Sequence, residues 1–226
     1  SYAGLRRLVA EGRFDEAREV FEGQQERDNP VAPTKISIGR AELSLGAAEE
    51  YECCLDIDRA VITGRIRTGK GEYRLRIFIS RDRNLFCLHL DGAPVESQLR
   101  LIPLAEMCPA LAELHHPEPQ FCTEGELRVL RQEIPAGRCY AVAWNTTGPD
   151  FFMAVEAGTT VESAANRAES TWEQAAAAGC ERLYTEHERG WKEFWQFSSV
   201  CLPEARMELL WYYGIYLLAS SAKCGV

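Results

Sequence analysis

The sequence predicts a mainly β protein with added helices, built around a large antiparallel β-sandwich. Residues 35–157 alternate apolar and polar side chains with a period of two, which is typical of strands. Both flanking regions instead repeat their apolar residues at helical spacing. With 226 residues, of which 46% are hydrophobic, the chain has enough apolar material for one large domain or two small ones.

Residues 1–25 are expected to form a helical hairpin. Apolar residues from Leu5 to Val9 precede a glycine stop at Gly12. A second helical pattern begins at Phe14. The segment from Gly12 onward is similar to half of a tetratricopeptide repeat, but no second copy follows about 34 residues later, which excludes a repeat array.

Residues 26–158 are expected to form the sandwich. Segment 60–68 and the next alternating segment flank a turn at Gly69-Lys70-Gly71, which predicts a β-hairpin with Ile66 and Tyr73 on one face. Four apolar residues of this hairpin are predicted to be buried: Ile66, Leu75, Ile77 and Ile79. Four arginines on the other face are predicted to be largely exposed: Arg65, Arg67, Arg74 and Arg76. Further strands are predicted at 41–45, 51–57, 85–91, 126–134, 138–146 and 151–157.

Residues 159–202 are expected to form linker helices. Thr159 or Thr160 could cap the first of them, which extends to Ala178. The second is predicted over 180–197 and carries a broad aromatic stripe that must pack against another element.

Residues 203–226 are expected to hold one helix that is apolar on every side, with Pro203 in its first turn. Such a helix belongs inside a large protein, and only Lys223 to Val226 follow Ala222. We therefore expect the chain to be a piece of a longer protein, with self-association through the 203–221 helix when that helix is uncovered.

Composition restricts the partners. The chain has 25 lysines and arginines against 34 acids, a net charge of −9, which argues against nucleic acid as a partner. The longest run without a charged or strongly polar residue, 209–219, is too short for the roughly 20 residues of a membrane span. Nine cysteines without any CxxC spacing favour a reducing compartment, and no signal peptide is visible.

Two motif matches fail on residue type. Residues 64–70 fit the start of a phosphate-binding P-loop, but Gly71 stands where a serine or threonine should bind magnesium, and the context is strand-turn-strand. The pair His187-Glu188 begins like a zinc-protease helix, but Trp191 occupies the position of the second histidine.

Other polar groups have ordinary explanations. His115 and His116 lie near Cys108 and Cys122, but their spacing matches no zinc motif, so we expect a surface loop. The four-arginine face could hold an anion, although a solvated sheet face is the simpler interpretation. Asn145-Thr146-Thr147 is a glycosylation sequon only in a secreted eukaryotic protein. Three glutamates of the second linker helix fit its solvated face: Glu186, Glu188 and Glu193.

The order of these segments resembles the N-terminal half of glycoside hydrolase family 95, the alpha-L-fucosidase and alpha-L-galactosidase group. Three stretches carry the resemblance: residues 5–21, residues 51–80 (YECCLDIDRAVITGRIRTGKGEYRLRIFIS) and residues 187–218 (HERGWKEFWQFSSVCLPEARMELLWYYGIYLL). In that family a large β-sandwich, or super-sandwich, is followed by linker helices and an α/α toroid. Related toroid families, including disaccharide phosphorylases, share this layout.

The resemblance implies that the chain is the non-catalytic N-terminal region of an inverting exo-glycosidase, acting on carbohydrate through the parent enzyme. The toroid would begin near Glu204, and the family's catalytic acid and base-assisting residues lie in the toroid. No catalytic residue, metal or cofactor is therefore expected in this chain. The alternatives are a free-standing carbohydrate-binding or adaptor sandwich and the N-terminal region of a related phosphorylase.

Overall fold

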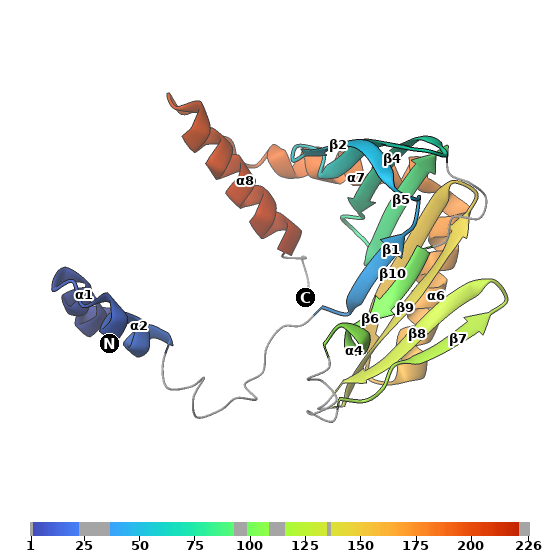
Figure 1. Ribbon diagram of the computed structural model, residues 1–226, viewed down its shortest axis with the longest axis horizontal. Helices are drawn as coiled ribbons and strands as arrows, with labels where there is room; N and C mark the ends of the chain where they lie inside the picture. The colour runs from blue at the N-terminus through green and yellow to red at the C-terminus, as the bar shows by residue number, and fades with distance from the viewer. Residues whose placement is uncertain (1, 23–36, 93–98, 109–115, 135–136, 222–226) are drawn as a thin grey trace.

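A computed structural model describes residues 2–22, 37–92, 99–108, 116–134 and 137–221 (Figure 1). In this part of the chain an eight-stranded antiparallel sheet has the order β2-β3-β4-β5-β10-β9-β8-β7. Its strands are β2 (Ala48–Asp56), β3 (Val61–Thr68), β4 (Gly71–Ile79), β5 (Leu85–Asp91), β7 (Gln120–Glu124), β8 (Leu127–Ile134), β9 (Arg138–Thr147) and β10 (Asp150–Gly158). A two-stranded antiparallel sheet pairs β1 (Gly39–Leu43) with β6 (Leu99–Pro103).

The small sheet covers one face of the large sheet. Leu99 and Leu101 of β6 share a buried cluster with residues of β4, β5, β8, β9 and β10. The indole Nε1 of Trp144 also donates a hydrogen bond to the backbone carbonyl of Leu99 at 3.1 Å. This packing confirms the predicted fold class, a β-rich protein with two facing sheets and added helices.

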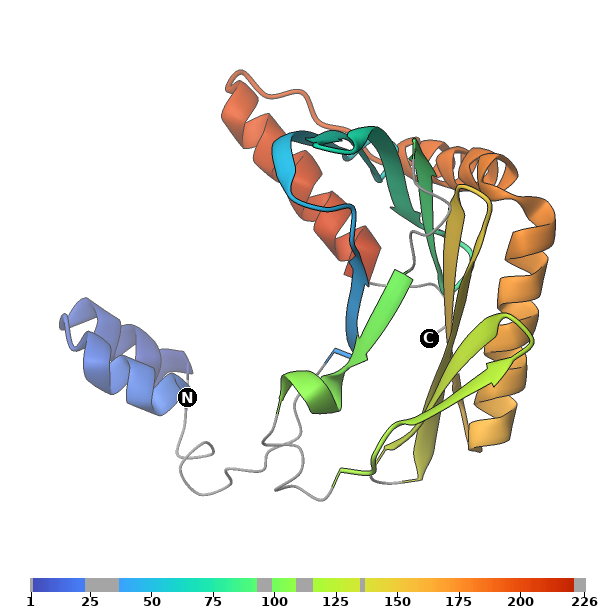
Figure 2. The ribbon, with the colours of Figure 1, turned by 45° about the vertical axis from the view of Figure 1, so that its right-hand side comes forward.

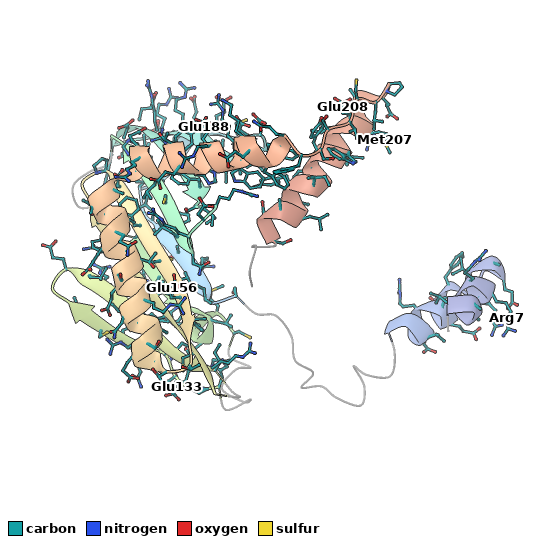
Figure 3. The ribbon with its side chains drawn as sticks, turned by 180° about the vertical axis from the view of Figure 1, so that it is seen from behind. Arg7, Glu133, Glu156, Glu188, Met207 and Glu208 are labelled. Carbon is teal, nitrogen blue, oxygen red and sulfur yellow. The ribbon has the colours of Figure 1, made fainter. Side chains whose placement is uncertain are left out.

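Helices cover the opposite face of the large sheet (Figure 2). Helix α6 (Val161–Ala178) lies along β8, β9 and β10, and α7 (Cys180–Trp195) follows it at a sharp angle (Figure 3). Gly179, with a φ of +76°, occupies the corner between them, a backbone conformation that favours glycine. The prediction of two helices with a break at Gly179 is confirmed, and the side chain of Thr160 caps α6.

Among the described residues, four further helices lie outside this layered region. Helices α1 (Tyr2–Ala10) and α2 (Phe14–Glu22) pack on each other as a hairpin, and α4 (Leu104–Met107) is a short turn after β6. Helix α8 (Ala205–Ser221) follows α7. Pro203 therefore precedes α8 by two residues, and the predicted position of this proline in the first helical turn is wrong.

The hairpin of β3 and β4 has the predicted turn and register. Thr68 pairs with Gly71, and Ile66 pairs with Tyr73. Tyr73 is buried, while Ile66, Leu75 and Ile77 are half-buried against the cluster shared with β6.

Two burial predictions in this hairpin are wrong. Ile79 is 59% exposed because it lies at the end of β4 and outside the area that the small sheet covers. The side chain of Arg76 is only 21% exposed, because α7 covers the face on which all four arginines were expected to be solvated, and Arg76 pairs with Glu181 of α7. Arg65, Arg67 and Arg74 are exposed as predicted.

Two strands were not predicted. Strands β6 and β7 fall between the alternating segments, each only five residues long. Other boundaries differ from the prediction by up to three residues: β1 begins at Gly39 and β2 at Ala48. None of the helices in the described part of the chain is long and apolar enough to span a membrane.

Candidate functional site

Helix α7 is anchored to the turn between β2 and β3 by His187. The His187 ring is 2% exposed, and its Nε2 lies 2.9 Å from the carbonyl oxygen of Arg59 and 3.2 Å from that of Ala60. Since both partners accept, Nε2 carries the proton and donates. Burial lowers the pKa of His187. This histidine is a structural contact between α7 and the turn that joins β2 to β3, a role that was not predicted from the sequence.

A continuous aromatic cluster joins α7 to α8. Trp191 lies at its centre, with ring centroids 5.4 Å from Phe194, 6.1 Å from Trp195 and 5.6 Å from Tyr216. The Trp195 ring also lies 5.7 Å from Tyr212 of α8. The aromatic stripe of α7 therefore packs against another element, as predicted, and that element is α8 for Trp191 and Trp195.

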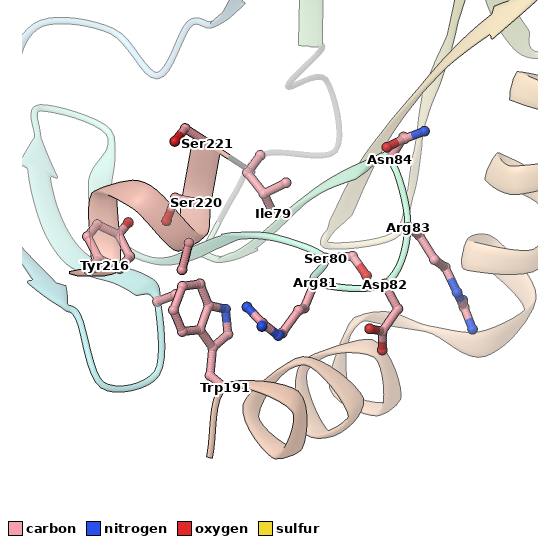
Figure 4. A pocket seen from close by; sticks show the side chains of 12 residues that line it. Ile79, Ser80, Arg81, Asp82, Arg83, Asn84, Trp191, Tyr216, Ser220 and Ser221 are labelled. Atoms are coloured by element: carbon pink, nitrogen blue, oxygen red, sulfur yellow. The ribbon is translucent and has the colours of Figure 1, made fainter. Parts of the chain in front are cut away.

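A cavity of about 620 Å³ opens beside this cluster (Figure 4). The loop between β4 and β5 forms one wall and the last turn of α8 forms another. The Arg81 guanidinium lies 4.8 Å from the centroids of both Trp191 and Phe194, a cation–π geometry. Asp82 is the one carboxylate among the lining residues that the structure describes.

The chemistry of this cavity is limited. Trp191 is 4% exposed and contacts Arg81 and Tyr216, so its ring offers no free face for stacking on a sugar. Glycoside hydrolysis needs two carboxyl groups on opposite sides of the scissile bond, and the described lining supplies only Asp82. The described residues therefore make this cavity a gap between α8 and the sandwich, with one carboxylate in the described lining.

Helix α8 presents a large apolar surface beyond this contact. None of its residues is buried, and six of its large side chains are at least 44% exposed. They are Met207, Leu209, Leu210, Tyr213, Leu217 and Leu218. We refer to these six residues as the α8 apolar surface. Figure 3 labels Met207 near the N-terminal end of α8, which residues 196–204 connect to α7.

A row of polar residues crosses the helix-covered face of the sheet at the start of α7. Arg76 of β4 is opposite His89 of β5, and His89 is opposite Asp150 of β10. His89 Nδ1 lies 2.6 Å from Asp150 Oδ1, and His89 Nε2 lies 3.3 Å from Asp91 Oδ1. Asp150 Oδ2 accepts a hydrogen bond from the backbone amide of Cys180 at 3.1 Å, so Asp150 caps the first turn of α7.

The thiol of Cys180 completes this group. Burial, together with the charge of Asp150, raises the pKa of Cys180 to about 11. Burial also raises the pKa of Cys87, two residues before His89 on the same strand. Within the described residues one group offers three metal-type ligand atoms within 4.8 Å of one another: His89, Asp150 and Cys180.

The residues singled out in the sequence do not form a common site. Lys70 is exposed in the hairpin turn, which confirms the rejection of a P-loop. His116 Nδ1 contacts the carbonyl of Pro117, and His115 lies outside the described residues. Asn145 Nδ2 donates to the carbonyl of Glu126.

The glutamates of α7 form ion pairs at its surface. Glu186 pairs with Arg83 at 3.3 Å and with Arg182 at 3.1 Å. Glu188 pairs with Arg59 at 3.2 Å. Glu193 is exposed as predicted, whereas Glu186 and Glu188, which were predicted on the same solvated face, are half-buried against the sandwich.

The polar row was not predicted from the sequence. His89 and Asp91 belong to β5 and Asp150 belongs to β10, and only the pairing of these two strands brings Asp150 beside His89. The alternation that predicts a strand does not say which strand is its neighbour. No protein-family model matches this sequence, and a search of curated proteins found no match.

Proposed function

We propose that this chain is the non-catalytic N-terminal region of a carbohydrate-active enzyme, an inverting exo-glycosidase of the alpha-L-fucosidase type. Its sandwich would support an α/α toroid whose first helix is α8. The observation that carries the proposal is the α8 apolar surface, combined with the fixed attachment of α8 to α7 through Trp191 and Tyr216. A second helix packed on that surface would cover it, as paired helices do in a toroid.

In this proposal the toroid carries out catalysis and the sandwich supports it. Hydrolysis with inversion needs a general acid and a base-activated water held on opposite sides of the glycosidic bond. The cavity beside Trp191 has one carboxylate, Asp82, in its described lining, which supports a catalytic site elsewhere in the parent protein. The role left to the sandwich is to position the toroid.

The proposal is tested on the parent protein encoded by the complete open reading frame. We expect it to release free sugar from a panel of aryl fucosides and galactosides with inversion at the anomeric carbon, followed by NMR. Release of sugar 1-phosphate only when inorganic phosphate is added would instead identify a phosphorylase. Carbohydrate binding without turnover would identify a free-standing binding protein, and either result overturns the glycosidase proposal.

A further inference from the structure

Three side chains from three separate elements converge at the start of α7: His89 of β5, Asp150 of β10 and Cys180 of α7. We propose that they form a Zn²⁺ site with three protein ligands and a water molecule in the fourth position. Their ligand atoms all lie within 4.8 Å of one another. In tetrahedral zinc sites, bonds of about 2.0 to 2.3 Å place the ligand atoms roughly 3.3 to 3.8 Å apart, so zinc binding would lengthen the 2.6 Å contact between His89 Nδ1 and Asp150 Oδ1 and shorten the wider separations.

The donor set selects the metal. One imidazole nitrogen, one carboxylate oxygen and one thiolate sulfur suit zinc, which accepts all three. Calcium and magnesium prefer oxygen ligands alone, so Cys180 argues against them. A site with three protein ligands leaves one position open. The side chains of His89 and Asp150 are 21% and 16% exposed, so solvent reaches that side of the cluster, while Cys180 is buried.

Neighbouring groups hold the ligands in place. Asp150 uses Oδ2 for the amide of Cys180, which directs Oδ1 toward His89 and leaves Oδ1 as the metal ligand. Asp91 faces Nε2 of His89, so its carboxylate can accept a hydrogen bond from Nε2–H while Nδ1 binds the metal. Such a carboxylate behind a ligating histidine is a regular feature of zinc sites.

Arg76 lies beside the sulfur. Its guanidinium is ion-paired with Glu181, and its buried Nε has no hydrogen-bond partner in the described part of the chain. A thiolate at Cys180 would give this donor an acceptor. The negative groups around the site are then Asp91, Asp150, Glu181 and the thiolate. The positive groups are Arg76 and the metal ion.

Binding exchanges a proton for the metal. The Sγ–H bond of Cys180 breaks, its proton passes to solvent, and an Sγ–Zn bond forms. Zinc also replaces the hydrogen bond between Nδ1 of His89 and Oδ1 of Asp150: the neutral imidazole carries its one proton on Nε2, toward Asp91, and Nδ1 offers its lone pair to the metal, so the histidine releases no proton. No oxidation or reduction is involved.

The test uses a background protein in which four cysteines are replaced by serine, because accessible thiols bind metals adventitiously: Cys53, Cys54 and Cys201, which are the exposed ones among the described residues, and Cys224, which lies outside them. Zn²⁺ affinity is measured by competition with a chromophoric chelator, and Co²⁺ is added separately as a spectroscopic probe. We expect one tight zinc site per chain. We also expect Co²⁺ to give the intense d–d bands of tetrahedral cobalt with a thiolate-to-cobalt charge-transfer band.

Three substitutions should weaken zinc binding by about 100-fold or more, since loss of even an outer partner costs 10- to 100-fold. They are Cys180→Ser, His89→Gln and Asp150→Asn. The last retains an oxygen to cap the Cys180 amide, which preserves the start of α7. The matched control Cys122→Ser changes a half-buried cysteine on another strand and should leave affinity unchanged. Circular dichroism verifies folding of each variant.

X-ray absorption on the zinc-loaded background protein keeps the test decisive if a variant fails to fold. We expect one sulfur at about 2.3 Å and the remaining ligands to be nitrogen or oxygen at about 2.0 to 2.1 Å. A first shell without sulfur would overturn the proposal. Unchanged zinc affinity in the folded Cys180→Ser protein would also overturn the proposal. So would a background protein that binds no more zinc than a buffer-only control.

Discussion

The imidazole Nε2 of His187 donates to the carbonyl oxygen of Arg59 at 2.9 Å, which ties the middle of α7 to the turn between β2 and β3. The other ring nitrogen, Nδ1, is buried without a hydrogen-bond partner in the described part of the chain. A second proton on Nδ1 would therefore place a charge in an apolar environment, with Phe78 and Trp191 beside the ring.

We predict a loss of stability in acid that depends on His187. Burial lowers the pKa of His187 below its ordinary value of 6.5, so the unfolded chain takes up the proton more readily than the folded chain. The stabilising contribution is therefore present above about pH 6.5 and is lost as the pH falls through the folded-state pKa. Urea unfolding from pH 8 to pH 5 measures it. His187→Gln should flatten this dependence, whereas His116→Gln should leave its slope intact.

Arg81 should stabilise the contact between the sandwich and α7. Its guanidinium lies over both Trp191 and Phe194, and cation–π contacts contribute about 0.5 to 2 kcal/mol. We expect Arg81→Ala to lower the free energy of unfolding by an amount in that range. The exposed Arg189 of the same helix provides the control, Arg189→Ala. Equal effects of the two substitutions in urea titrations would contradict the assigned role of Arg81.

The two threonines before α6 should differ. The Thr160 side chain accepts a hydrogen bond from the Ser163 amide at 3.1 Å, which identifies it as the N-cap. Thr160→Ala should therefore cost about 1 kcal/mol of stability. Thr159→Ala, one residue earlier and also exposed, should cost only a few tenths of a kcal/mol. Thermal unfolding of both variants measures the difference. The reverse order would show that the cap is assigned to the wrong residue.

The α8 apolar surface should make this chain self-associate. Each of its large side chains gains roughly 1.5 to 3 kcal/mol on full burial, so contact between copies is favourable. Light scattering should show oligomers for the full chain and a smaller species for a chain ending at Pro203. The double substitution Leu209→Lys and Leu218→Lys should reduce association, and Ser220→Lys on the same helix should not.

A different result would argue against the role given to α8. If the full chain and the chain ending at Pro203 are both monomeric and equally soluble, α8 needs no further partner. The helix would then complete a domain within this chain, and the proposal of an adjoining toroid would lose its main support.

We expect this chain by itself to hydrolyse no aryl glycoside above background. A lone carboxylate such as Asp82, without a second carboxyl group across a sugar, lacks most of the rate advantage of a glycosidase. A chromogenic panel of fucosides and galactosides checks this. Turnover that disappears on Asp82→Asn substitution would place catalysis in this chain and contradict the prediction.

The sequence pattern predicted those elements whose structure depends only on residues close together in the chain. The hairpin of β3 and β4 follows from alternation and its glycine turn, and the break at Gly179 follows from composition. Burial of Arg76 could not be predicted, because it depends on α7, more than 100 residues later, lying on that face. The polar row of His89 and Asp150 was missed for the same reason: strand order is a long-range property.

The centre of the contact between helix α6 and the sheet is formed by alanine methyl groups. Ala164, Ala165 and Ala168 are fully buried, and they face Ala141 and Ala143 of β9, which are also fully buried. Small side chains on both sides let this part of the helix lie close to the sheet. Even one added methylene on either side would push the layers apart, because the contact between these buried alanines leaves no space for a larger side chain. The helix works as a fixed spacer, and the direction in which α7 and α8 leave the sandwich depends on it.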